Sequence, residues 1–407
     1  MKVRTQIIVI ALLRVILNTM HRMVYPFLTI FARGLGVDVT TLSLVLSGRN
    51  LAGIVGPAFG PVADTRGRKF VMLSGIALFT LGVGIVAVRP GFQTFSAALI
   101  LAILSKSLFD PAVQAYFGDR VPYEQRGRAI AVTEMAWSLS FIAGVPVIGF
   151  LIARYGWAAP FPVLTALGLG MFLVIWRIIP HDWPHASEGG VTGAPAWASL
   201  QAVVTSIPAL AGISIALWSS IANESVNLNF GVWLSDSFGL QIAALAGASA
   251  VIGIAELSGE SLVALVTDRL GKGRAVLLGL SVNTLAALLL PFVGRTEAGA
   301  LVGLFFFYLS FEFMIVSQLP MMTETVAQAR GTVMSINLMA FGIGRSAGAL
   351  LSAYVYARYG FPAVTLVAVI FNVLAMLALA EMQNKLAVLP TLRSWLSRTF
   401  SRDPGSE

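Results

Sequence analysis

Long apolar segments without a charged residue recur along this chain, and they constrain its fold more than any other feature. Residues 70–88, for example, contain no Asp, Glu, Lys or Arg. About 20 apolar residues in a helix cross the ~30 Å hydrocarbon core of a bilayer, where every backbone polar group must be bonded within the protein. Only 11% of the 407 residues are charged and 57% are hydrophobic, against about 25% charged in average usage. The sequence therefore predicts an all-α polytopic membrane protein and excludes a soluble globule.

Twelve membrane helices in two bundles are predicted from the spacing of these segments. The only polar, Pro- and Gly-rich linker inside the chain, residues 180–199, separates six segments from six. We therefore expect an N-terminal six-helix bundle over residues 1–179, a cytoplasmic linker over 180–199, a C-terminal six-helix bundle over 200–382, and a cytoplasmic tail over 383–407. The predicted helices span residues 5–33, 40–63, 69–89, 93–118, 127–153, 157–179, 200–234, 239–266, 274–294, 297–322, 331–357 and 360–381.

The second half of the chain repeats landmarks of the first half at a constant interval. Three matched pairs are each 204 positions apart, since 268 − 64, 331 − 127 and 359 − 155 all equal 204. A single offset of about half the chain length indicates an internal duplication. The matched pairs are Asp64 with Asp268, Gly127 with Gly331, and Tyr155 with Tyr359.

Lysines and arginines are concentrated in the loops on one side of the predicted helices. That side includes the turn at 60–69, its counterpart at 267–274 and both chain ends, whereas the opposite loops hold only Arg33, Arg89, Arg154, Arg295 and Arg358. Because cytoplasmic loops carry the excess of basic residues, we expect both termini in the cytoplasm and the protein in the plasma (inner) membrane. The net charge of +8 then reflects topology and not nucleic-acid binding.

Two predicted loops carry short charged motifs. Residues 60–69 are Gly-Pro-Val-Ala-Asp-Thr-Arg-Gly-Arg-Lys, and residues 119–128 are Asp-Arg-Val-Pro-Tyr-Glu-Gln-Arg-Gly-Arg. The first resembles the signature between the second and third helices of the major facilitator superfamily of transporters, and the second resembles the signature between that family's fourth and fifth helices. The chain departs from the family pattern at Thr65, where Arg is usual, and at Ala264, where the second copy lacks the first Gly.

The resemblance implies a secondary transporter whose bundles rock about a central site, acting as a monomer in the bilayer. It also implies that polar loop residues form charge contacts that close the cytoplasmic side in one state. We expect no enzymatic activity, no cofactor and no bound metal; the chain contains no cysteine and no nucleotide-binding Gly-Lys loop. The cytoplasmic-gate candidates are Gly60, Asp64, Gly67, Arg68, Asp119, Arg126, Asp268, Gly271 and Arg330.

Charged residues inside the apolar spans follow a pattern of three. Every third predicted helix, at 69–89, 157–179, 274–294 and 360–381, has none within its apolar span. A charge that faces hydrocarbon costs about 2.5–3.5 kcal/mol, so the charged helices must turn these residues toward protein or water. This arrangement is typical of nested three-helix repeats around a central cavity. The charge-free helices are therefore expected to face lipid.

Carboxylates in these spans are candidates for proton coupling. Glu256 and Glu260 lie one helical turn apart, and two carboxylates at this spacing should not both be ionised in a low-dielectric site. At least one of them is thus expected to exchange protons. Lys106 falls where proton-antiporting members of the superfamily typically carry an Arg, and Gly144-x-Pro146-x-x-Gly149 is similar to their helix-kinking motif. The full set of proton-coupling candidates is Asp110, Glu134, Glu224, Glu256, Glu260 and Glu312.

Polar and aromatic residues on the charged helices are expected to line the substrate cavity. Arg14, Asn18, His21 and Arg22 share one face of the first helix, and Tyr25 extends it. The cavity candidates are Arg14, Asn18, His21, Arg22, Tyr25, Arg49, Lys106, Trp137, Asn223, Asn227, Asn337, Phe341 and Arg345.

Purely structural interpretations of several of these residues stay open. Lys106 and Asp110 are spaced to pair within one helix. Arg345 could instead neutralise a carboxylate of the predicted helix 239–266 or 297–322, and His21 could be an ordinary hydrogen-bonded interior group. Glu260 could act as a gate residue, because it lies nearer the cytoplasmic end of its helix.

Three functions are compatible with these sequence patterns. The favoured one is proton-coupled export of small amphipathic compounds by alternating access. The second is uptake or exchange of an anionic organic metabolite, since the four basic groups of the first half could clamp a carboxylate or phosphate. The third is a membrane sensor on the same fold that does not transport.

Overall fold

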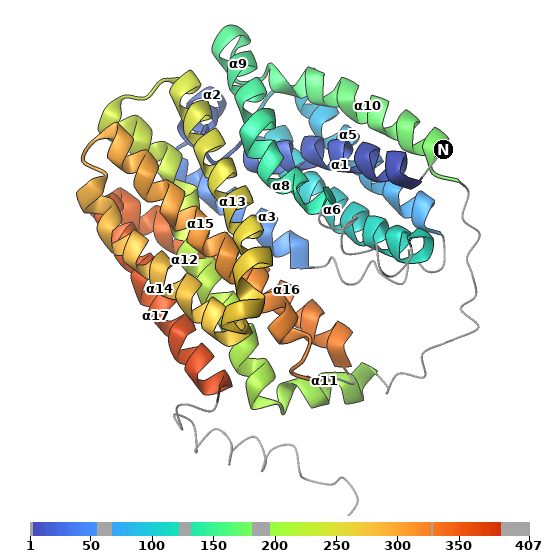
Figure 1. Ribbon diagram of the computed structural model, residues 1–407. Helices are drawn as coiled ribbons and strands as arrows, with labels where there is room; N and C mark the ends of the chain where they lie inside the picture. The colour runs from blue at the N-terminus through green and yellow to red at the C-terminus, as the bar shows by residue number, and fades with distance from the viewer. Residues whose placement is uncertain (1–2, 55–66, 122–131, 181–195, 327–328, 384–407) are drawn as a thin grey trace, which may run out of the picture.

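The computed structural model of the chain describes residues 3–54, 67–121, 132–180, 196–326 and 329–383 (Figure 1). All regular secondary structure in these ranges is helical, which confirms the predicted fold class. The elements are α1 (Val3–Arg22), α2 (Leu28–Leu35), α3 (Val39–Ala52), α5 (Arg68–Val88), α6 (Phe92–Arg120), α8 (Ala136–Leu139), the π-helical turn η2 (Ser140–Gly144), α9 (Val145–Tyr155), α10 (Pro160–Ile178), α11 (Ala196–Val204), α12 (Ile207–Phe238), α13 (Ile242–Leu270), α14 (Lys272–Val293), α15 (Glu297–Met322), α16 (Arg330–Tyr359) and α17 (Phe361–Met382).

Nine stretches in the described part of the chain have the length and apolar composition of membrane-crossing helices, and two bent pairs raise this number to eleven. The remaining predicted segment corresponds to α1, which is 20 residues long. Most predicted boundaries lie within a few residues of the observed ones. The tenth predicted helix, 297–322, coincides with α15.

The first predicted helix, 5–33, is wrong as a single element, because it is broken into α1 and α2 at residues 23–27. Pro26 lacks an N–H and disfavours helical backbone at the residue before it. The break places the Tyr25 side chain, only 1% exposed, at a turn inside the protein. A helix end is thereby buried at the level where the site is built.

The seventh predicted helix, 200–234, is also wrong as a single element. It consists of α11 and α12, which meet at an angle of 82°. Ser206 adopts an extended backbone and its side chain accepts a hydrogen bond from the N–H of Ala209, so it starts a new helix, with Pro208 in the first turn.

The fifth predicted helix contains a π-helical turn where the sequence indicates a kink. Residues Ser140–Gly144 form η2 between α8 and α9. Pro146 has no N–H to give to the preceding turn, so the regular bonding pattern is interrupted there. Gly144 lies so close to Thr19 of α1 that a Cβ atom at this position would overlap the Thr19 hydroxyl. This contact fixes how closely α1 and η2 approach.

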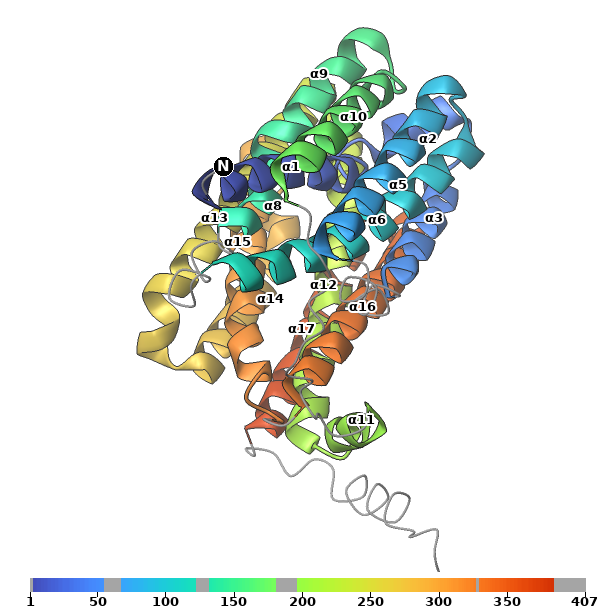
Figure 2. The same cartoon turned by 90° about the vertical axis from the view of Figure 1, so that its right-hand side faces the viewer.

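The helices form two groups that match the two halves of the sequence. α5 packs on α6 and α10 in the first half, while α12 packs on α16 and α17 and α14 packs on α15 in the second (Figures 1 and 2). α3 against α16, and α9 with η2 against α13, are principal contacts between the groups. We call the surface where the two groups meet the seam.

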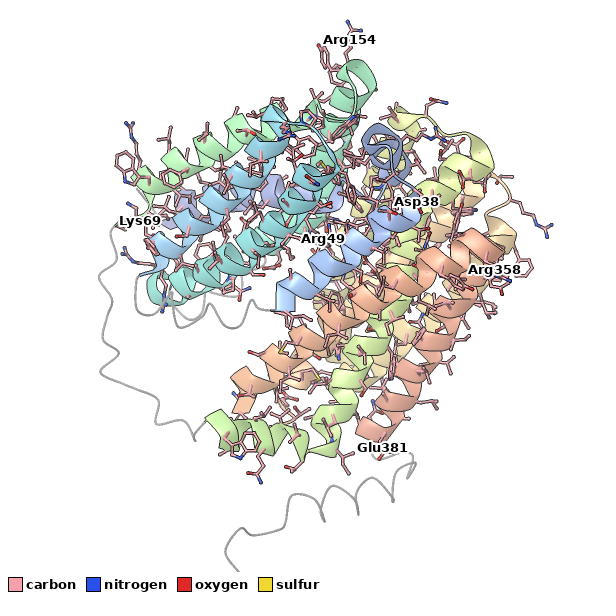
Figure 3. The ribbon with its side chains drawn as sticks, turned by 180° about the vertical axis from the view of Figure 1, so that it is seen from behind. Asp38, Arg49, Lys69, Arg154, Arg358 and Glu381 are labelled. Atoms are coloured by element: carbon pink, nitrogen blue, oxygen red, sulfur yellow. The ribbon has the colours of Figure 1, made fainter. Side chains whose placement is uncertain are left out.

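The four charge-free helices, α5, α10, α14 and α17, lie on the outside of these groups. Each presents a leucine that is more than half exposed, namely Leu81, Leu169, Leu285 and Leu366. The loops also sort as the basic residues predict. In Figure 3, Asp38, Arg154 and Arg358 lie toward one end of the molecule, and Lys69 and Glu381 lie toward the other. That the latter end faces the cytoplasm stays a prediction.

Candidate transport site between the two bundles

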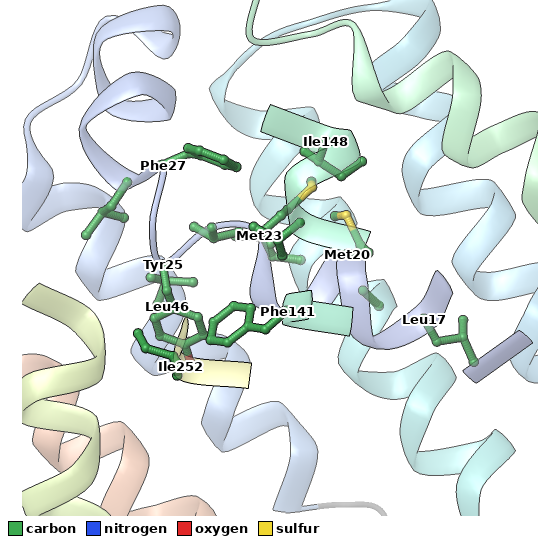
Figure 4. Packing of buried hydrophobic residues seen from close by; sticks show 14 of the residues in the cluster. Leu17, Met20, Met23, Tyr25, Phe27, Leu46, Phe141, Ile148 and Ile252 are labelled. Carbon is green, nitrogen blue, oxygen red and sulfur yellow. The ribbon is translucent and has the colours of Figure 1, made fainter. Parts of the chain in front are cut away.

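The seam is tightly packed at the end opposite to α11. Gly231 of α12 lies against the backbone of Tyr25 and Pro26, where a Cβ atom would be 2.7 Å from both carbonyl oxygens. Phe141 of η2 and Phe230 of α12 meet edge to face with ring centroids 6.5 Å apart. Figure 4 shows labelled residues of the first half, including Phe141, gathered with Ile252 of α13. The ribbons of the two groups diverge toward the end where α11 lies (Figures 2 and 3).

The Tyr25 hydroxyl joins residues from both halves at the inner edge of this packed region. It accepts hydrogen bonds from Arg49 of α3 (2.7 Å) and Arg345 of α16 (2.8 Å), and it donates one to Glu224 of α12 (2.9 Å). A phenol has one donor and two acceptor lone pairs, so its bonding capacity is filled. Tyr25 thus connects the first half to the second through two separate helices.

Arg345 forms its ion pair with a helix other than the two that the sequence suggested, 239–266 and 297–322. Its Nε atom lies 2.9 Å from Glu224 Oε2, so its carboxylate partner is on α12 and not on α13 or α15. The reason is the close approach of α12 and α16 at Gly348, where a Cβ atom would be 2.9 Å from the Ile221 carbonyl oxygen. Glu224 also accepts a bond from Asn227, whose amide oxygen accepts one from Tyr308.

Arg49 is completely buried and has no carboxylate partner in the described ranges. It donates hydrogen bonds to the His21 carbonyl oxygen (3.0 Å), the Tyr25 hydroxyl and the Asn50 side chain (3.3 Å). A buried cation is costly unless it is paired and hydrogen-bonded. The charge around Tyr25 is therefore one negative group, Glu224, against two positive ones, Arg49 and Arg345.

Arg22 and Glu256 form a buried ion pair across the seam. The two guanidinium nitrogens of Arg22 on α1 lie 2.7 and 2.6 Å from the two carboxylate oxygens of Glu256 on α13. The guanidinium also donates to the Trp137 carbonyl oxygen (2.9 Å), and its carbon lies 3.4 Å from the ring centroid of Phe141. This bidentate geometry is the strong form of the arginine–carboxylate contact.

A second ionic group lies within the first half. Arg14 forms two hydrogen bonds with Glu134, and its Nε atom lies 3.0 Å from Asp110 without hydrogen-bond geometry. Lys106 bonds Asp110 (2.6 Å), which confirms the predicted intrahelical pair, and also Asn18 of α1 (2.7 Å). Two cations and two carboxylates balance one another here.

Glu260 and Glu312 lie beside Glu256 without a basic partner of their own in the described part of the chain. Among the described residues, Glu260 accepts a hydrogen bond from Ser138 of α8 (3.3 Å), across the seam. α13 and α15 touch at Gly259, where a Cβ atom would lie 3.0 Å from Glu312 Cβ. We call Glu256, Glu260 and Glu312 the carboxylate cluster. It has one guanidinium, that of Arg22, within ion-pair distance among the described residues.

Several buried amide side chains and one imidazole each have one polar atom without a hydrogen-bond partner among the described residues. His21 has an unpaired Nδ1 atom and its ring lies 5.8 Å from that of Trp137. Phe341 lies 5.9 Å from the Arg345 guanidinium carbon, measured to its ring centroid. The unpaired amide atoms belong to Asn18, Asn50, Asn223 and Asn337.

The predicted cytoplasmic gate is only partly described. Gly60, Asp64 and Arg126 lie outside the described residues, and only the backbone of Asp119 and Asp268 is described, in α6 and α13. Gly67 and Gly271, which are 204 positions apart, adopt matching left-handed φ values of 88° and 82° before α5 and α14. Arg68 and Arg330 begin α5 and α16. The gating contacts stay a prediction.

Three contributors to the seam are absent from the residues selected by sequence. Ser47 of α3 and Ser346 of α16 have hydroxyl oxygens 2.5 Å apart, and Phe141 stacks on Arg22. A charged residue in an apolar helix stands out because its exposure to hydrocarbon is costly. A neutral serine or phenylalanine has no such cost, so the sequence does not indicate which of them lie at the seam.

Residues 10–329 match the family model of the Major Facilitator Superfamily. The chain belongs to this superfamily. It is 26% identical over 352 residues to an uncharacterized MFS-type transporter of Bacillus subtilis, YwfA, which covers 86% of this chain and 85% of that protein. It is also 26% identical over 384 residues to the multidrug resistance protein MdtG of Yersinia enterocolitica, covering 86% and 87% of the two chains.

Solved structures share the superfamily fold with this chain. The human organic anion transporter MFSD10 superposes with a TM-score of 0.68, covering 93% of this chain and 98% of that one, at 18% sequence identity. The multi-pass membrane architecture predicted from the apolar segments is thereby confirmed.

Proposed function

We propose that this superfamily member exports small amphipathic compounds in exchange for protons, by alternating access in the plasma membrane. The observation that carries the proposal is the carboxylate cluster at the seam, in which Glu256 is paired with Arg22 while Glu260 and Glu312 have no basic partner among the described residues. Carboxylates that outnumber the cations in a site of low dielectric bind protons more readily than they do in water. The similarity to MdtG, named as a multidrug resistance protein, supports export.

The Arg22–Glu256 pair supplies the coupling between proton and conformation. Its two members belong to different halves, so the pair forms when the halves close at this level and breaks when they part. A proton on Glu256 removes the charge that holds Arg22, and it therefore favours the separated state. A ligand shifts such an equilibrium only through its different affinity for the two states. A proton binds the Glu256 carboxylate more tightly in the separated state than in the closed state, where Arg22 is paired with it.

Unpaired amide atoms and aromatic rings on the helices of the two halves suit an amphipathic substrate. Trp137 and Phe341 offer apolar faces, and Asn223 and Asn337 hold buried amide atoms without partners among the described residues. Ligand sites typically combine apolar walls with a few polar groups that fix orientation. Glu312, which lacks a basic partner in the described ranges, provides a counter-charge for a substrate cation.

A second candidate is uptake or exchange of an organic anion. The observation that favours it is Arg49, which is 0% exposed and has no carboxylate within ion-pair distance among the described residues. An anion held between Arg49 and Arg345 would balance the excess positive charge around Tyr25. The fold similarity to the human organic anion transporter MFSD10 is compatible with this candidate.

Transport in proteoliposomes distinguishes the two candidates. Purified protein is reconstituted, a pH gradient is imposed, and accumulation of a lipophilic cation and of an organic anion is followed separately. Export with proton exchange predicts gradient-driven movement of the cation that stops when the gradient is collapsed. Movement of the anion, independent of the gradient, would instead establish the second candidate.

A matched pair of variants tests the carboxylate cluster. Glu312→Gln should weaken the response of transport to the pH gradient, because it removes a neighbouring negative charge that favours binding of a proton to Glu256. Glu297→Gln makes the same chemical change at the exposed first turn of the same helix, α15, and should leave transport unchanged. Equal responses of both variants to the gradient would disprove the role of the cluster.

A further inference from the structure

A groove on the outer surface of the first half lies outside the transport site. It has a volume of about 1070 Å³ and is lined by residues of α5 and α10, with Arg89 and Thr94 at one end. The two helices lie side by side and are both free of charge in their apolar spans (Figures 1 and 2). Away from the Arg89 end the polar lining residues are Thr80 and Thr165, whose hydroxyls bond the Ile76 and Phe161 carbonyls of their own helices. The groove is therefore suited to face the hydrocarbon of the membrane.

The dimensions of the groove match one leaflet of a bilayer. Along α5 it extends from Ala77 to Arg89, a rise of 12 steps between residues and ~18 Å at 1.5 Å per step. Half of the ~30 Å hydrocarbon core is ~15 Å. A lipid acyl chain that lies along the groove would therefore place its headgroup beside Arg89.

Arg89 is free to bind such a headgroup. Its side chain is exposed and forms no ion pair with the described residues. Its backbone is fixed, because the Arg89 carbonyl accepts a hydrogen bond from the Thr94 hydroxyl (2.7 Å) and its N–H bonds Ile85. A guanidinium binds a phosphate oxygen pair in bidentate fashion, so the charge at this end complements an anionic phospholipid.

The groove lies in the first half, and it depends on side chains of that half and not on the fold that both halves share. The offset of 204 holds in these helices, since Thr80 and Thr284 make the same hydrogen bond one turn back, to Ile76 and Leu280. At the same offset three of the lining residues are replaced by large aliphatic residues in the second half. Gly84 corresponds to Leu288, Pro162 to Leu366, and Ala166 to Ile370.

We propose that this groove binds an anionic phospholipid, with one acyl chain between α5 and α10 and the phosphate on Arg89. The site is separate from the seam and does not depend on the transported substrate. Bound lipid would fill the space that side chains fill in the second half.

The groove is tested by substituting its lining residues with the residues found at the matching positions of the second half. Gly84→Leu with Ala166→Ile should fill it with the side chains that the repeat carries, while Gly170→Leu adds the equivalent leucine, that of Leu374, in open space on the same helix outside the lining. Each full-length protein is purified in detergent and titrated with palmitoyl-oleoyl phosphatidylglycerol in native mass spectrometry. The double variant should retain one phosphatidylglycerol fewer than the wild type and the Gly170→Leu variant.

The headgroup contact is tested by Arg89→Gln with phosphatidylglycerol and phosphatidylcholine in parallel. A basic residue near the membrane surface contributes about a fivefold preference for an anionic lipid, and this preference should disappear. An unchanged lipid count in the double variant overturns the groove as the site, and an unchanged preference in Arg89→Gln overturns the headgroup assignment. Thermal unfolding of each variant shows that it is folded.

Discussion

Arg22 and Glu256 lie 234 positions apart in the sequence and form a bidentate ion pair, with nitrogen–oxygen distances of 2.7 and 2.6 Å. Both side chains are about 95% buried or more, and they come from opposite halves of the chain. The pair is therefore a contact between the two halves, and the proposed export cycle requires the halves to make and break it.

Neutralising one member of this pair should destabilise the protein more than neutralising both. Removal of one partner leaves an uncompensated buried charge, which costs about 3–5 kcal/mol. We expect Arg22→Gln and Glu256→Gln each to lower the thermal unfolding temperature in detergent, and the double variant to recover part of the loss. Strictly additive losses would show that the two side chains do not interact.

Tyr25→Phe should weaken the connection between the halves. It removes the oxygen that Arg49 and Arg345 bond, leaving buried donors unsatisfied at a cost of about 1–3 kcal/mol. We expect a lower unfolding temperature and altered transport. Tyr354→Phe, an exposed tyrosine on α16, is the control and should behave as the wild type.

A disulfide between positions 47 and 346 should lock the seam. The native chain has no cysteine, so Ser47→Cys with Ser346→Cys creates the only thiol pair. The serine oxygens are 2.5 Å apart, close to the ~2.05 Å of a sulfur–sulfur bond. Oxidation should stop transport and a reductant should restore it. Transport by each single-cysteine variant should be unaffected by the oxidant. Transport that continues with the cross-link formed would exclude movement at this contact.

Gly144→Ala should destabilise the contact between α1 and η2, and Thr19→Ala should relieve it. The added Cβ atom overlaps the Thr19 hydroxyl, and overpacking of this kind costs about 1–3 kcal/mol. Chemical unfolding of the single and double variants measures the difference. No recovery in the double variant would place the strain elsewhere.

The sequence determined the fold and the set of helices that carry the site. Segments without charge, such as residues 70–88, were expected to face lipid because a charge in hydrocarbon is costly, and the observed exposure of Leu81 agrees. The 204-residue offset also holds in the structure, down to the matching backbone of Gly67 and Gly271. These features depend on local composition and on periodicity, which a sequence displays directly.

Tertiary structure alone decided which charges meet. The sequence left the partner of Arg345 open and favoured the wrong helices, because α12 and α16 approach one another through glycines whose effect depends on their neighbours. It also could not show that Glu256 takes Arg22 while Glu260 and Glu312 keep no basic partner among the described residues. Ion pairing depends on distances of a few ångströms between helices far apart in the chain, and helix packing sets those distances.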